Sequence, residues 1–222
     1  MAKPILYKIC LFAGLTSFTV FAAGCQSAYY KTMETFGKHK RDILVSRVEK
    51  ARDAQEDTKK QFQTALEKFS SVVKVPSSEL QNKYNQLKSE LDKSEAQAKE
   101  VSTRIADVED VSRALFKEWN TELDQYTNKE LRRTSEQKLK QTQDRCDQLI
   151  GAMKQAERKI APVLSAFRDQ VLFLKHNLNA QAVASLQGEL VSIESNVALL
   201  IKEMDASIAE ANAFISTMAA EQ

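Results

Sequence analysis

The chain has 222 residues, of which 43% are hydrophobic and 28% are charged, a composition typical of a soluble helical protein rather than a disordered one. It contains only five glycines and three prolines, too few turn residues for a β-rich fold. Lys and Arg number 32 and Asp and Glu number 30. This near balance gives no global field that would attract nucleic acid, so we expect no nucleic-acid partner.

The first 24 residues have the pattern of a secretory signal. Lys3 and Lys8 give a positive start, and residues 9–23 form a run without charge. That run is too short to span ~30 Å of hydrocarbon comfortably at ~1.5 Å per residue. It suits the apolar region of a cleaved signal peptide, and an uncleaved membrane anchor is the alternative.

The signal ends in Ala22-Ala23-Gly24-Cys25, which resembles the lipobox of bacterial lipoproteins, although Ala22 replaces the more usual Leu. By that resemblance the signal is cut before Cys25 and the thiol is joined to diacylglycerol. Gln26 then favours the outer membrane, because lipoproteins retained at the inner membrane tend to have Asp there. The resemblance implies a periplasm-facing protein with residues 25–35 as a lipidated tether and 36–222 as the body.

Two helical segments are predicted in the first half of the body. The first, about 32–74, has apolar residues at spacings of three and four up to Pro76, which disfavours helix in the residue before it. The second, about 79–126, begins where Ser78 and Gln81 have capping-box spacing. It carries a seven-residue repeat of apolar positions from Leu80 to Tyr126, which predicts a coiled-coil-like seam.

The apolar repeat of the second segment loses its phase near Thr127. Thr127 and Glu130 again have capping-box spacing, so we predict a reversal of the chain at 127–129. One continuous helix is the alternative. The third segment, about 129–177, starts polar and becomes apolar, and Pro162 is expected to kink or restart it. Residues 129–145 hold six basic and three acidic residues, typical of a solvated helix, with contact to anionic lipid headgroups as the alternative. Asn177 and Asn179 predict a helix stop and a cap before the fourth segment, about 180–220.

These four segments predict an all-α fold. Their similar lengths and short connections favour an elongated antiparallel bundle with up-down-up-down order. An extended hairpin is the alternative arrangement.

Several stretches resemble a family of bacterial envelope lipoproteins known as domain of unknown function 2959. They are Gly37-x-x-Lys40-Arg41-Asp42-Ile43-Leu44-x-x-Arg47-Val48, Leu115-Phe116-x-Glu118-Trp119, Pro162-Val163-Leu164 and the longest, Asp169 to Ala180 with the sequence DQVLFLKHNLNA. The resemblance implies a coiled-coil-containing envelope protein and supplies no catalytic residues.

Catalytic and metal-binding patterns are weak in this sequence. The two histidines, His39 and His176, have Phe rather than Glu three residues before them, unlike a helical di-metal site. Cys146 falls on the apolar phase of its helix, which favours a buried core residue over a redox thiol. We therefore expect no catalytic residue, no metal, no cofactor and no enzymatic activity.

Two groups of residues remain as candidate sites. The corner between the third and fourth segments is a candidate docking site for a partner, or a turn whose polar groups bond to the backbone; its residues are Lys175, His176, Asn177 and Asn179. The second group lies in apolar runs that cover more than one face of their helix, which predicts either the centre of the bundle or a partner or ligand surface. Its residues are Phe167, Phe173, Leu199 and Leu200.

We expect a non-enzymatic envelope scaffold, spacer or adaptor that contacts an envelope protein or another copy. The alternative is a bundle that binds a lipid or another apolar ligand between its last two helices.

Overall fold

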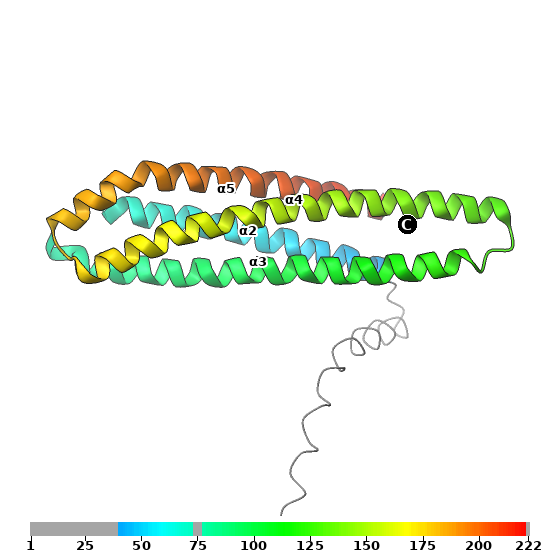
Figure 1. Ribbon diagram of the computed structural model, residues 1–222, viewed down its shortest axis with the longest axis horizontal. Coiled ribbons are helices and arrows are strands. Elements are labelled where there is room, and N and C mark those ends of the chain that lie inside the picture. The colour runs from blue at the N-terminus through cyan, green and yellow to red at the C-terminus, as the bar shows by residue number, and fades with distance from the viewer. Residues whose placement is uncertain (1–39, 73–76, 221–222) are drawn as a thin grey trace, which may run out of the picture. The chain divides into compact units, whose positions relative to one another are not determined.

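The structure is a computed structural model that describes residues 40–72 and 77–220. Its elements are helix α2 (Lys40–Val72), the short 3₁₀ helix η1 (Ser77–Glu79), and helices α3 (Leu80–Leu123), α4 (Lys129–His176) and α5 (Ala180–Ala220). Each long helix packs on two neighbours, α2 on α3, α3 on α4, α4 on α5, and α5 on α2. The result is a bundle in which consecutive helices run antiparallel (Figure 1). The predicted all-α bundle is confirmed.

The core follows the three-and-four spacing of apolar residues in each helix. Leu44, Phe62 and Phe69 of α2 are buried together with Ile105 of α3 and residues of both later helices. A fully buried Leu or Phe contributes about 1.5–3 kcal/mol relative to an exposed one. The core therefore supplies the main force that aligns the four helices, since helices of this kind gain most of their stability from packing an apolar face.

Ion pairs on the outside of the bundle connect neighbouring helices. Arg47 of α2 pairs with Asp107 of α3 at 2.9 Å, and Lys59 of α2 pairs with Asp205 of α5 at 2.9 Å. Arg168 of α4 likewise pairs with Glu95 of α3. Partly exposed pairs of this kind contribute only about 0–1 kcal/mol each to the free energy of unfolding. They therefore influence which helices are neighbours and how those helices are aligned more than they stabilise the fold.

The predicted helix bounds are close to those observed, with corrections at two caps. Residues 32–39 and 73–74 of the first predicted segment lie outside the described residues. The Ser78 cap is wrong, because residues 77–79 form a 3₁₀ turn that leads into α3, and Glu79 holds the cap position without a side-chain bond. The Thr127 cap is wrong by one residue. Asn128 takes the extended backbone of a cap, and its side-chain oxygen accepts hydrogen bonds from the Glu130 and Leu131 amides at 2.9 and 3.2 Å.

The reversal between the second and third segments is confirmed, because α3 ends at Leu123 and α4 begins at Lys129. The continuation of the second segment to residue 126 is wrong, since the Gln125 amide bonds to the Glu122 carbonyl at 3.0 Å and closes the helix early. The expected restart at Pro162 is also wrong. Helix α4 continues through Pro162, which lies on the exposed face, where water can satisfy the carbonyl that loses its partner.

Candidate functional site

The corner between α4 and α5 brings the four predicted docking residues together at the end of the bundle that also holds η1 (Figure 1). The Asn177 side chain donates to the Phe173 carbonyl at 3.0 Å, and the Asn179 side-chain oxygen accepts from the Ala182 amide at 3.0 Å. Asn177 therefore closes the end of α4 and Asn179 caps the start of α5, as their positions predicted. Lys175, His176 and Asn179 are exposed and Asn177 is half-buried; the Asn179 side chain is engaged in the cap, so Lys175 and His176 are the charged or titratable side chains that the corner presents to solvent.

The four predicted apolar surface residues do not share one surface. Phe167 is buried and its ring lies against those of Phe62 and Phe69 of α2, with centroids 6.2 and 6.0 Å apart. Leu200 is fully buried. Phe173 and Leu199 are exposed by 37% and 47% respectively. Two of the four are thus core residues, and only Phe173 and Leu199 are accessible to a partner.

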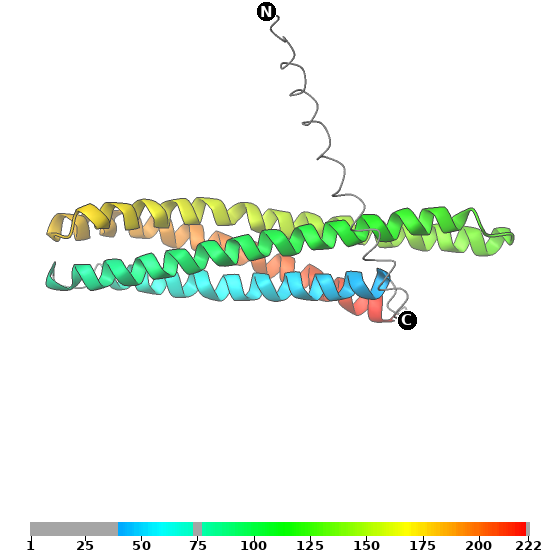
Figure 2. The same ribbon diagram turned by 90° about the horizontal axis from the view of Figure 1, so that it is seen from below.

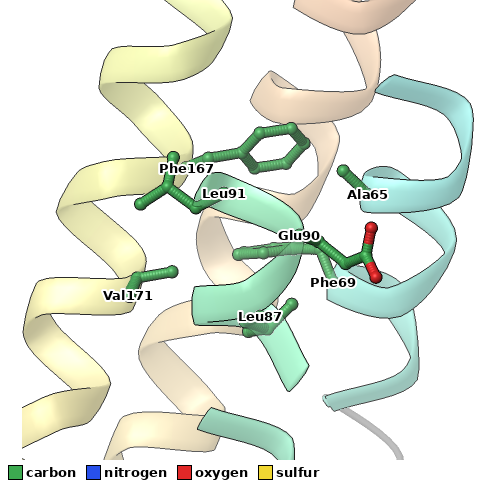
Figure 3. A pocket seen from close by; sticks show the side chains of 7 residues that line it. All are labelled: Ala65, Phe69, Leu87, Glu90, Leu91, Phe167 and Val171. Atoms are coloured by element: carbon green, nitrogen blue, oxygen red, sulfur yellow. The ribbon is translucent and has the colours of Figure 1, made fainter. Parts of the chain in front are cut away.

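A small cavity lies beside Phe167, whose ring points from α4 into the space between the helices (Figure 3). The cavity volume is about 10 Å³, which is at the lower limit for one water molecule. A lipid or another apolar ligand needs a space of about 300 Å³ or more. The cavity lies among α2, α3 and α4 and is lined by Ala65, Phe69, Leu87, Glu90, Leu91, Phe167 and Val171.

Glu90 is the acidic residue at this cavity, and its carboxylate is held by neighbours. Gln61 donates to it at 2.8 Å and Lys93 at 2.9 Å. Burial alone would raise the pKa of Glu90, but these hydrogen bonds and the Lys93 charge outweigh burial and lower the pKa below its ordinary value. The carboxylate therefore stays charged at neutral pH and joins α2 to α3, a structural role rather than that of a general acid.

A second buried polar contact crosses from α2 to α5. The Ser207 hydroxyl donates to the Gln55 side-chain oxygen at 2.8 Å, and both residues are fully buried. The Gln55 side-chain nitrogen has no hydrogen-bond partner in the described part of the chain. A buried polar pair in an apolar seam disfavours other registers, because a shifted register would leave both groups without partners.

Cys146 of α4 is fully buried, in agreement with its place on the apolar phase. Burial raises the pKa of its thiol to about 11, against the opposing effect of a hydrogen bond with Ser112. The thiolate is the reactive form of cysteine. At neutral pH this side chain is therefore a small core residue and is unsuited to nucleophilic or redox chemistry in the folded bundle.

One feature of the bundle was not expected from the sequence, a projecting hairpin tip made by residues 119–138 of α3 and α4. Helices α3 and α4 have 44 and 48 residues, whereas α2 and α5 have 33 and 41. At the base of the tip, the Trp119 indole donates to the Ser135 hydroxyl at 2.8 Å. Every residue from Asp124 to Thr134 is exposed. The sequence signal for this projection was the polar start of the third segment.

In residues 40–72 and 77–220, no group of three or more His, Cys, Asp or Glu side chains is arranged to hold a metal ion. None of the described helices combines the length and apolarity needed to cross a membrane.

The fold and its surface define an all-α protein, an antiparallel bundle of four long helices with one projecting hairpin. The chain belongs to the family described as "Protein of unknown function (DUF2959)", whose family model matches residues 29–218. This is the family that the sequence stretches resembled. No curated protein and no solved structure matches the chain.

Proposed function

We propose that the chain is a lipid-anchored protein of the bacterial envelope that acts as a non-enzymatic spacer or adaptor. The observation that carries this proposal is Cys25, placed directly after small residues and an uncharged run with a positive start. Buried acyl chains contribute about 0.8 kcal/mol per CH₂, so two or more chains on one residue hold a protein stably on a membrane. Gln26 favours the outer membrane as the site.

The bundle supports a spacer role because it is long and its helices are packed on one another along their length. Helix α4 has 48 residues, which correspond to about 72 Å at 1.5 Å per residue. A packed bundle of this length keeps its two ends well apart. The corner with Lys175 and His176 then presents contact residues to an envelope protein or another copy at one end of the rod.

The non-enzymatic part of the proposal has its support in the chemistry of the reactive residues. Cys146 is buried with a raised pKa, and His176 is exposed at a helix end. Glu90 is charged and paired. An enzyme needs a nucleophile or base within hydrogen-bond reach of a substrate. Turnover by the purified protein that is lost on His39→Ala or His176→Ala substitution would overturn this part.

The test of the anchor compares two cysteine variants of the full chain. Cys25→Ser removes the proposed lipid attachment, and Cys10→Ser is the matched control within the proposed signal. We expect the parent and the Cys10→Ser protein to fractionate with membranes and to yield, by mass spectrometry, an acylated N-terminal peptide that begins at Cys25. We expect Cys25→Ser to leave the membrane fraction. A parent protein whose mature form retains Met1, or carries no acyl mass at Cys25, contradicts the proposal.

A further inference from the structure

The hairpin tip extends beyond the described ends of the other two helices. Lys40, the first residue of α2, pairs with Glu118 at 2.9 Å, so α3 continues five residues past α2 to Leu123. Gln148 pairs with Glu210 and Gln155 with Glu203, which fixes a constant antiparallel register of α4 and α5. In that register Ala220 is level with residue 138, and residues 129–137 extend past it by about 14 Å. Figures 1 and 2 both show this projection.

The tip lies at the end of the bundle where α2 begins (Figure 1). The chain enters the bundle at Lys40, and 14 residues, 26–39, connect that entry to Cys25. Even fully extended, 14 residues span no more than about 50 Å. An anchored protein thus has its tip at the bundle end that is tied to the membrane, while the corner with Lys175 lies at the other end.

The surface of the tip combines exposed apolar and basic side chains. Leu131 is exposed by 58% and Tyr126 by 41%. The tip holds four acidic and four basic residues, so it has no net charge that would attract it to a membrane from a distance. Three of the basic residues, Lys129, Arg132 and Arg133, nevertheless lie within the first five residues of α4. Tyrosine is enriched at membrane interfaces, and Lys and Arg there contact anionic headgroups.

We propose that the hairpin tip rests on the lipid headgroups of the membrane that carries the Cys25 lipid. Tyr126 and Leu131 enter the interface, and the basic residues beside them contact anionic headgroups. This inference rests on the proposed lipid anchor. A short tether raises the effective concentration of the second contact to the millimolar range, so a tip too weak to bind alone is held in place. The anchor and the tip give the rod two points of contact and set its orientation on the membrane.

The test uses a tryptophan reporter, since Trp119 is the only tryptophan of the chain. In a Trp119→Phe background, Tyr126→Trp places the reporter at the tip and Phe173→Trp places it at the opposite end. Both positions are exposed aromatic residues, so the two variants are matched. The lipidated full chain is inserted into vesicles of phosphatidylethanolamine and phosphatidylglycerol, with or without bromine on the acyl chains. Bromine quenches tryptophan only at short range.

We expect bromine to reduce the Tyr126→Trp emission by roughly half, as for a side chain in the interface, and to leave the Phe173→Trp emission unchanged. Adding Leu131→Asp to the tip reporter is expected to restore its emission, because an aspartate resists transfer into the interface. If bromine leaves the emission of both reporters equally unchanged, in protein that floats with the vesicles, the tip contact is overturned while the anchor stands. Protein that carries no acyl group and does not float overturns the anchor, and the tip contact with it.

Discussion

Helices α3 and α4 run through both the four-helix body and the hairpin tip, and yet the two regions are stabilised differently. In the body, Ile105 and Leu149 are almost completely buried, and packing aligns the helices. In the tip, Leu123 is buried, but all residues from Asp124 to Thr134 are exposed, and local bonds such as the Asn128 cap take the place of most packing. The comparison shows that helical sequence alone does not reveal where a bundle ends. The following predictions test that difference.

The largest expected effect concerns two aromatic residues, one in each region. Phe62→Ala removes a fully buried ring that lies against Phe167 and should lower the free energy of unfolding by about 3–5 kcal/mol. Tyr126→Ala at the exposed tip should change it by less than about 0.5 kcal/mol. Urea unfolding followed by far-ultraviolet circular dichroism measures both. Equal losses would show that the tip is packed as tightly as the body.

A smaller effect is expected at the buried polar pair. Ser207→Ala leaves the Gln55 oxygen buried without its donor, at a cost of about 1–3 kcal/mol. The double variant Gln55→Leu with Ser207→Ala should recover most of that loss, because both polar groups are then gone. Ser135→Ala, which removes the bond to Trp119 at the half-buried base of the tip, is the control and should cost less. Unfolding free energies that show no loss for Ser207→Ala contradict the role of this pair.

The pH dependence of stability should distinguish Glu90 from an acidic residue of the tip. Because the folded state lowers the pKa of Glu90, this residue stabilises the fold above its unfolded pKa, and the contribution is lost as pH falls through the folded pKa. Glu90→Gln should therefore cost about 1 kcal/mol at neutral pH and nothing in acid. Glu122→Gln at the exposed tip controls for the loss of one negative charge. A Glu90→Gln deficit that persists in acid would falsify this account.

The smallest global effect is expected at the cap of α4. Asn128→Ala removes the acceptor for the Glu130 and Leu131 amides, which costs a helix about 1 kcal/mol. Since residues 124–134 have no buried side chain, we expect the tip to open separately from the body, so hydrogen exchange should accelerate at residues 130–133 and remain unchanged at buried residues of α4. Asn128→Ser keeps a capping oxygen and should exchange nearly as the parent does. Acceleration throughout α4 would show that tip and body open together.

The periodic body was well predicted from the sequence, since apolar spacing from Leu80 to Leu115 places those side chains on one buried face. The cap at Asn179 was also correct. The cap at Ser78 was wrong because residues 77–79 are already helical and no side chain caps α3. The cap at Thr127 was wrong because the neighbouring Asn128 has the extended backbone of a cap and makes the two side-chain bonds. The predicted restart at Pro162 was wrong because the proline lies on the exposed face of α4, where water can satisfy the carbonyl that loses its partner.

The candidate sites were predicted less well than the fold. Phe167 and Phe173 belong to one apolar region of sequence, but one ring is buried and the other is exposed. Phe167 lies on the three-and-four spacing of the buried residues of α4, with Val163 and Val171, whereas Phe173 lies off it, so helical phase separates the two rings although they share one apolar region. The hairpin tip depends on the difference in length between helices, and this follows from the register of pairs such as Lys40 with Glu118. Long-range register is a property of packing and was not readable from one segment.

The most direct test of the spacer or adaptor role is crosslinking in intact cells at the two ends of the rod. A photo-crosslinking residue at Lys175 or at Leu131 is combined with the native Cys25 or with Cys25→Ser. We predict that the Lys175 position captures an envelope component or a second copy only in the anchored form, and that the Leu131 position captures lipid rather than that component. Capture that is identical with and without Cys25, or no capture at Lys175 in either form, would contradict the account.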